Sequence, residues 1–224
     1  HASMPIGAYS EKQIMPEEKL VSVPDGVSNE VASCITLKGI TAEYLLHRAY
    51  PLKKGDKVLY HAAAGALGQI LCPWANALGA QKNGCHPVIT YSQKDVVTEV
   101  EKIFGKNSLD VVYDGVGSKT FKGSIETLKI RGMMVAFGNA SGYVETLDIK
   151  KDINAKGLFF TRPSIAHYTV KREELVESAK KVFDAVLTKK FKIEISKKYP
   201  LKDAAQAHKD LENRLLTGPA VIVP

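Results

Sequence analysis

The residues best suited to chemistry in this sequence form a short run of small side chains from His61 to Gly68. The run matches the glycine fingerprint GxGxxG, with Ala63 in the first glycine position. Gly65 lets the backbone approach a pyrophosphate, and Gly68 lets the following helix pack closely against the preceding strand. A helix N-terminus also offers unpaired N–H groups to an anion. The predicted phosphate contacts are Ala63, Ala64, Gly65, Ala66, Leu67 and Gly68. The alternative is a tight structural turn in an unrelated three-layer fold.

The elements that must position this turn alternate between strand-like and helix-like patterns. Expected strands span 57–62, 87–91, 109–113, 133–137, 157–161 and 220–223. Expected helices span 28–37, 41–48, 69–78, 96–104, 120–128, 172–187 and 202–215. Strands that alternate with helices predict a parallel sheet covered on both faces. The sequence therefore predicts an α/β fold with a doubly wound Rossmann sheet, and in that setting the fingerprint is far more specific than it is alone.

Further candidates follow the expected strands, because ligands bind at the carboxyl ends of parallel strands. Asp114-Gly115-Val116-Gly117 and Phe137-Gly138-Asn139 both occupy such positions, and their glycines suit a backbone that passes close to a cofactor. Val116 is a candidate cofactor contact on this ground, and we expect Phe137, Gly138 and Asn139 to line the nicotinamide-ribose region of a dinucleotide, against the alternative of plain turns. Phe160, Thr161 and Arg162 end the next strand and are candidates for the same reason.

Composition limits the other function classes. The 224 residues are 45% hydrophobic and 25% charged, which suits a globular chain. No stretch approaches the roughly 18 apolar residues that cross a bilayer, so we expect a soluble, cytoplasmic protein without a membrane segment. A net charge of +7 suits an anionic partner such as a phosphate-rich cofactor. The lysines are scattered without interleaved aromatics, which argues against nucleic-acid binding.

Cysteine and histidine patterns predict no metal site. Cys34, Cys72 and Cys85 form no CxxC pair, so we expect reduced thiols and no bound metal. His86, His167 and His208 lack close partners in the sequence and suit surface or packing roles. No catalytic acid, base or nucleophile is nominated.

Separate segments along nearly the whole chain resemble one family. They are LKGIT at 37–41, the run 61–68, DVVYDGVG at 110–117, RGMMVAFGN at 131–139, TRPS at 161–164 and YPLKDA at 199–204. Together they resemble the zinc-free NADPH:quinone oxidoreductases, relatives of zeta-crystallin in the medium-chain dehydrogenase/reductase superfamily. The resemblance implies NADPH as cofactor, hydride transfer to a quinone, and a homodimer built through the Rossmann domain.

The same resemblance implies a domain plan and further site residues. Residues 1–27 correspond to the end of a GroES-like β-rich catalytic domain, 28–190 to the Rossmann domain, and 191–224 to the return to the catalytic domain. Thr41 is implied to contact the nicotinamide side, Tyr91 the adenosine-phosphate end, and Arg214 the cofactor. The alternative for Thr41 is a helix-cap or buried hydroxyl. The alternatives for Tyr91 and Arg214 are a half-buried strand tyrosine and an exposed helix arginine.

The sequence departs from the family near residues 81–83. A Rossmann unit needs a second strand that reads the adenosine ribose about 20 residues beyond the glycine turn, yet Ala80 runs almost directly into Asn83. We expect a missing segment here, and the mass of the intact protein tests that expectation. Ala66 replaces a usual glycine, and Pro73 interrupts the helix and should kink it. Leu37 stands where zinc-using relatives place a thiolate.

Two rival functions remain open. One is the NADPH-dependent reduction of activated C=C bonds, as in enoyl or alkenal reductases of the same superfamily. The other is a non-catalytic RNA-binding or crystallin-like role.

Overall fold

The computed structural model describes residues 6–80, 89 and 94–224. The chain forms two compact units. One, the sheet unit, comprises Leu45–Ala64 and Leu71–Ser164. The other, the helix-pair unit, comprises His1–Tyr44, Gly65–Ile70 and Ile165–Pro224.

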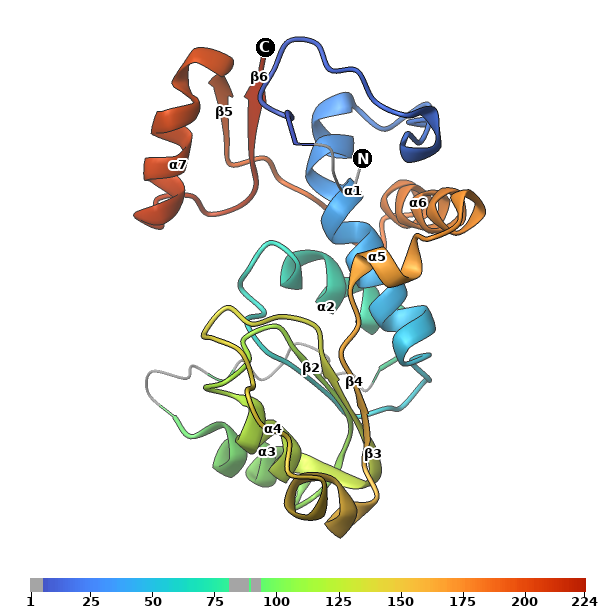
Figure 1. Ribbon diagram of the computed structural model, residues 1–224, viewed down its shortest axis with the longest axis vertical. Coiled ribbons are helices and arrows are strands. Elements are labelled where there is room, and N and C mark those ends of the chain that lie inside the picture. The colour runs from blue at the N-terminus through green and yellow to red at the C-terminus, as the bar shows by residue number, and fades with distance from the viewer. Residues whose placement is uncertain (1–5, 81–88, 90–93) are drawn as a thin grey trace. The chain divides into compact units, whose positions relative to one another are not determined.

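The sheet unit is built on four parallel strands in the order β1-β2-β3-β4. They are β1 (Val58–Tyr60), β2 (Leu109–Asp114), β3 (Leu128–Ala136) and β4 (Phe159–Thr161). Tyr60 pairs with Tyr113, Tyr113 with Val135, and Val135 with Thr161, so the four strands end nearly level. The segments that follow β1, β2 and β3 therefore emerge at one edge, and the predicted parallel α/β sheet is confirmed (Figure 1). The expected strand at 87–91 lies outside the described residues, apart from Ile89.

Apolar side chains that alternate along β2 and β3 bury both faces of the sheet, because successive strand residues point to opposite sides. Val112 and Met134 join the core formed with α3 (Val96–Phe104) and α4 (Phe121–Thr127). On the other face, the Tyr113 hydroxyl donates to the carbonyl oxygens of Leu45 at 3.2 Å and Tyr50 at 3.3 Å. That segment includes the π-helical turn η2 (Leu45–Ala49). A second helix, α2 (Gly68–Ala77), continues through Pro73, and its Trp74 ring contacts His47.

The helix-pair unit centres on α1 (Asn29–Tyr44) and α6 (Arg172–Leu187). The expected helices 28–37 and 41–48 are one continuous helix that passes into η2, so the predicted break was wrong. Gly39 lies inside α1 as a contact surface, since a Cβ there would come within 2.4 Å of Val182 Cγ1 on α6. The glycine reflects close helix packing, which local sequence does not distinguish from a helix end.

The C-terminal part of the helix-pair unit is a small α/β element. Strands β5 (Lys197–Pro200) and β6 (Ala220–Val223) pair in parallel, and α7 (Ala204–Glu212) connects them. Asp210 on α7 accepts hydrogen bonds from Lys197, Tyr199 and Gln206, and these bonds, Lys197 first, lower its pKa to about 2. The remaining elements are α5 (Ile165–Tyr168), η1 (Glu17–Lys19), η3 (Ile149–Ile153), η4 (Asn154–Lys156) and η5 (Leu201–Asp203). No helix in the described part of the chain is both long enough and apolar enough to cross a membrane.

Candidate cofactor site

The loops that follow β2 and β3 lie side by side at the carboxyl edge of the sheet. Phe137 N donates to Asp114 O at 2.9 Å, Ala140 N to Gly115 O at 3.2 Å, and Ser141 N to Val116 O at 2.7 Å. These bonds continue the backbone pairing beyond the strands themselves. The structure thus brings Val116 together with the segment Phe137–Asn139, four residues that the sequence nominated.

Glycines set how closely these two loops approach. A Cβ on Gly138 would come within 2.4 Å of Gly115 O, and one on Gly117 would come within 2.4 Å of Gly142 O. Gly117 also has a φ of +94°, a conformation that favours glycine. The Phe137 ring covers Gly115, where an added Cβ would meet the ring at 2.8 Å. At Gly117 and Gly138 the backbones of the two loops are therefore in direct contact.

Asp114 holds the loop after β2 through hydrogen bonds. Its side chain is fully buried, and Oδ1 accepts hydrogen bonds from Val116 N at 2.8 Å and Gly117 N at 3.0 Å. Oδ2 accepts from Thr120 Oγ1 at 2.7 Å and Ser124 Oγ at 3.1 Å. A carboxylate has about four lone-pair sites, and all four are used here. Sequence reasoning noted Asp114 only as part of a turn, although a carboxylate between a buried strand and Gly-Val-Gly was a usable signal.

His61 is a second buried polar residue that the sequence analysis did not single out. Its backbone N–H donates to Tyr113 O at 3.1 Å, and its Nε2 lies 2.9 Å from Ser124 Oγ. Burial lowers the pKa of His61, opposed by the nearby Asp114 charge, so the imidazole is neutral at neutral pH.

The glycine turn leads from β1 into the N-terminus of α2. Ala62 opens it with a φ of +64°, and α2 begins as Gln69 N donates to Gly65 O at 3.1 Å. Within the described residues, no acceptor takes the N–H groups of Ala66 and Leu67. Unpaired N–H groups at a helix N-terminus fit a pyrophosphate.

The other nominated residues lie in varied surroundings. Thr41 donates its hydroxyl to Leu37 O at 2.9 Å within α1, and Arg214 follows α7 with a φ of +57°. Phe160 packs edge-on against Phe121, with ring centroids 6.2 Å apart, and Arg162 Nη1 donates to Pro163 O at 3.1 Å. Tyr91 lies outside the described residues. The cofactor roles of all these residues, and of Thr161, stay predictions.

Two of the three cysteines, Cys34 and Cys72, lie in the described part of the chain. Cys34 is buried and free, and burial raises its pKa. Cys72 is disulfide-bonded, so the expectation of reduced thiols was wrong for Cys72. Sequence spacing does not reveal which thiols a fold brings within bonding distance. Among the described residues, no three or more His, Cys, Asp or Glu side chains are grouped to hold a metal ion.

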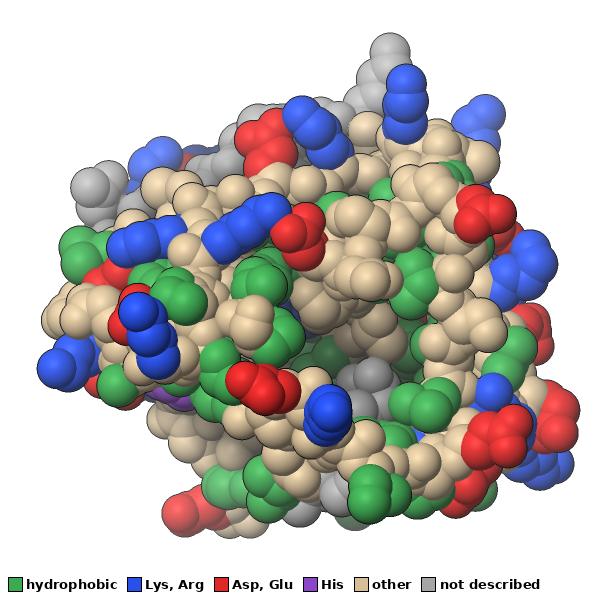
Figure 2. All heavy atoms as spheres, turned by 90° about the horizontal axis from the view of Figure 1, so that it is seen from above, with side chains coloured by type: hydrophobic (Ala, Val, Ile, Leu, Met, Phe, Trp, Pro, Cys, Tyr) green, Lys and Arg blue, Asp and Glu red, His purple; other side chains and the backbone are tan. Residues whose placement is uncertain are grey.

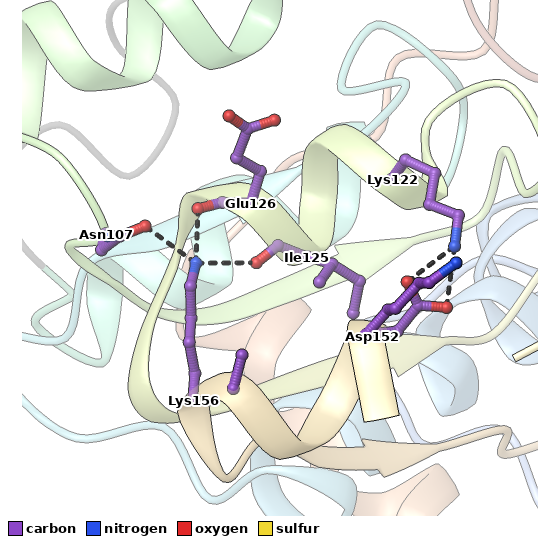
Figure 3. Close-up of a pocket in the computed structure, with 8 residues that line it drawn as sticks. Asn107, Lys122, Ile125, Glu126, Asp152 and Lys156 are labelled. Atoms are coloured by element: carbon purple, nitrogen blue, oxygen red, sulfur yellow. Dashed lines mark hydrogen bonds and ion pairs between the residues drawn. The ribbon is translucent and has the colours of Figure 1, made fainter. Parts of the chain in front are cut away.

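A surface pocket of the sheet unit is lined mainly by charged side chains (Figure 3). Lys156 Nζ donates to the carbonyl oxygens of Ile125 at 3.2 Å, Glu126 at 2.7 Å and Leu128 at 2.9 Å. These are carbonyls at the end of α4, where a cation is favourable. Lys122 pairs with Asp152 across the pocket at 2.6 Å. The lysines thus stabilise the fold, which accounts for this pocket without a ligand.

A parallel sheet with glycine loops along its carboxyl edge defines a Rossmann-like nucleotide-binding protein. Comparisons with known proteins identify the family within this class. Residues 83–222 match a family model described as zinc-binding dehydrogenase. Over 238 positions the chain is 40% identical to 2-haloacrylate reductase of Burkholderia sp., covering 98% of this chain and 72% of the relative. Over 242 positions it is 38% identical to quinone oxidoreductase 1 of Escherichia coli, covering 100% and 74%.

Solved structures agree with these relatives. The crystal structure of 2-haloacrylate reductase has a TM-score of 0.92 at 40% identity, covering 99% of this chain and 74% of that one. The Escherichia coli quinone oxidoreductase complexed with NADPH has a TM-score of 0.82 at 39% identity, covering 90% and 67%. The chain belongs to the quinone oxidoreductase family of medium-chain dehydrogenases/reductases, as its motifs predicted.

The alignment lengths show that a relative has residues that this chain lacks. The match to the Escherichia coli relative extends over 242 positions, 18 more than the 224 residues of this chain. The relative therefore carries residues within the matched region that have no counterpart here.

Proposed function

We propose that this protein binds NADPH and transfers its hydride to a quinone without zinc. The observation that carries the proposal is the carboxyl edge of the sheet, where two glycine loops pair. Separately, within the described residues, the turn before α2 leaves the N–H groups of Ala66 and Leu67 without an acceptor. The relative solved with NADPH supports the choice of cofactor.

The protein's part in this reaction is binding and orientation. The N–H groups of Ala66 and Leu67 would hold the pyrophosphate, and Val116 with Phe137–Asn139 would line the nicotinamide ribose. NADPH, when bound, supplies the hydride. Quinones accept hydride readily, so the protein needs no strong acid or metal at the acceptor. Leu37, where zinc-using relatives carry a thiolate, agrees with zinc-independent chemistry.

Residues outside these loops complete the proposed site. The further proposed cofactor contacts are Thr41, Tyr91, Phe160, Thr161, Arg162 and Arg214. The domain plan, with 1–27 and 191–224 belonging to a GroES-like domain and 28–190 to the Rossmann domain, is part of the same proposal. A cytoplasmic location is also part of this proposal.

A second candidate reaction is the reduction of an activated C=C bond. The relative at 40% identity is a 2-haloacrylate reductase, which favours this alternative specifically. Both reactions begin with hydride transfer from the same cofactor and differ in the acceptor. Basic and acidic side chains are interspersed on the face that Figure 2 shows, which does not favour RNA binding at that face.

One assay separates these functions. Purified protein is mixed with NADPH and either 1,4-benzoquinone or 2-chloroacrylate, and loss of NADPH absorbance is followed by stopped flow. Faster oxidation with the quinone than with 2-chloroacrylate is the expected result, and NADH in place of NADPH tests cofactor preference. NADPH binding without oxidation by either acceptor would contradict both reactions.

We also propose a homodimer formed through β4. This strand lies at the end of the described sheet, and Phe159 on it is 57% exposed. An uncovered edge strand with apolar side chains favours pairing with a second copy. Sedimentation equilibrium gives the mass in solution, and a Phe159→Lys variant is expected to shift it toward the monomer.

A further inference from the structure

Three buried polar side chains connect the start of the glycine turn to the loop after β2. His61, Ser124 and Asp114 are 1%, 0% and 0% exposed. His61 Nε2 lies 2.9 Å from Ser124 Oγ, and Ser124 Oγ lies 3.1 Å from Asp114 Oδ2. His61 immediately precedes Ala62, and Asp114 immediately precedes Gly115.

The available protons decide which group donates and which accepts in each of these hydrogen bonds. Ser124 has one hydroxyl hydrogen and two acceptors within reach, Thr120 O at 2.9 Å and Asp114 Oδ2 at 3.1 Å. Donating the hydrogen to the charged Asp114 makes the stronger bond. Ser124 Oγ then accepts a hydrogen bond, which requires a proton on His61 Nε2. A neutral imidazole with its proton on Nε2 meets this need. Each member thus holds the next in one orientation.

The backbone at both ends of this connection is strained or glycine-dependent. Ala62 has a φ of +64°, a left-handed conformation that is strained for a residue with a Cβ. Gly117, with a φ of +94°, donates its N–H to Asp114 Oδ1. Strained backbone persists where the surroundings over-determine it, and such sites cluster at ligand clamps.

We propose that His61, Ser124 and Asp114 form a positioning network that holds the turn beginning at Ala62 and the loop Gly115–Gly117 in fixed register for NADPH. The inference rests on the proposed binding of NADPH. None of the three side chains contacts the cofactor, because all are buried beneath the loops. The network acts by presenting both backbone segments in one geometry, so that binding does not have to order them.

The helix-pair unit offers a matched control. Ser178 on α6 is 2% exposed and donates to Glu43 Oε2 at 2.9 Å, so it too is a buried helix serine bonded to a buried carboxylate. Ser124→Ala and Ser178→Ala therefore each remove a hydrogen bond from a buried helix serine to a buried carboxylate, and Ser124→Ala also removes the contacts to His61 and Thr120. Only Ser124 lies between the two loops.

Two measurements on the full chain test the network. Fluorescence titration gives the NADPH dissociation constant, and hydrogen exchange without cofactor reports on 61–64 and 115–117. Ser124→Ala is expected to raise the dissociation constant about tenfold, since small misplacements of binding groups are costly, and to speed exchange in both segments. Ser178→Ala should leave the constant within about twofold, as expected for an independent site. His61→Leu should behave like Ser124→Ala, and His61→Gln, which retains a donor, should restore binding.

The outcomes separate the network from the cofactor assignment. Equal dissociation constants for the two serine variants, or faster exchange confined to α4, would overturn the network while leaving NADPH binding intact. Failure of the unmodified protein to bind NADPH would overturn the proposed function and this inference together.

Discussion

Two buried carboxylates in the two units show how one chemical group can serve different ends. Glu43 lies between α1 and α6, where Ser178 donates at 2.9 Å and Lys181 at 3.3 Å, both from the facing helix. Asp114 lies at a strand end and takes two of its four hydrogen bonds from backbone N–H groups of a loop. The first carboxylate joins two helices and the second shapes a loop. Burial alone therefore does not distinguish a carboxylate that shapes a loop from one that joins two helices, but the nature of its donors does.

The largest expected difference in NADPH affinity between the two units comes from substituting one glycine in each. Gly138→Val places a side chain against the backbone oxygen of Gly115, which must move. NADPH affinity is expected to fall by more than about 100-fold, since the paired loops separate. Titration with NADPH measures it.

Gly39→Ala is the matching change at the helix pair, where a Cβ meets the Val182 side chain. Overpacking costs about 1–3 kcal/mol, offset by about 0.5–1 kcal/mol of helix preference. Thermal unfolding should show a modest loss of stability with NADPH affinity retained. Comparable affinity losses in both variants would remove the distinction between the two regions.

Amide substitutions test the carboxylates directly. Asp114→Asn places an NH₂ group among four donors, which leaves buried groups unpaired at about 1–3 kcal/mol each. Glu43→Gln keeps an acceptor for Ser178 and is expected to cost about 1 kcal/mol. Urea unfolding measures both, and a larger loss for Glu43→Gln would contradict the ranking.

Acid should affect the two units in different pH ranges. The pKa of His61 is lowered from 6.5 by burial, opposed by Asp114, so the unfolded chain binds this proton more readily. Its contribution to stability is complete above pH 6.5 and declines as the pH falls below that value. Asp210, with its pKa lowered from 3.8 to about 2, contributes stability that persists until the pH falls below 3.8.

Unfolding free energies measured from about pH 7.5 to about pH 5 check this difference. His61→Gln should flatten the decline in that range, whereas Asp210→Asn should leave it unchanged. An unaltered slope in His61→Gln would show that other groups cause the decline.

The smallest expected effect is at an exposed ion pair. Lys180 and Asp184 lie 2.6 Å apart on α6 with side chains 73% and 54% exposed. Lys180→Ala should change the unfolding free energy by about 0.3–0.5 kcal/mol. A change above about 1 kcal/mol would be out of line with a solvated pair, and high salt should abolish the difference.

Local patterns were sufficient to predict much of this molecule. The turn at 61–68, the strands around 109–113 and 133–137, and the helices at 96–104 and 172–187 follow from residue periodicity, because each element depends on neighbours within a few positions. The pairing of Val116 with Phe137–Asn139 followed from the rule that parallel strands end together.

Other features depended on residues far apart in the chain. His61 and Ser124 are separated by 63 positions, and Glu43 and Ser178 by 135. No local pattern marks such partners, so His61 and Ser124 passed unnoticed, and Gly39 suggested a helix end where there is a helix contact. The sequence by itself determined the family, the order of elements and the glycine loops, since these reside in short motifs. Only the tertiary structure decided which buried polar groups meet, because hydrogen-bond partners are chosen by three-dimensional proximity.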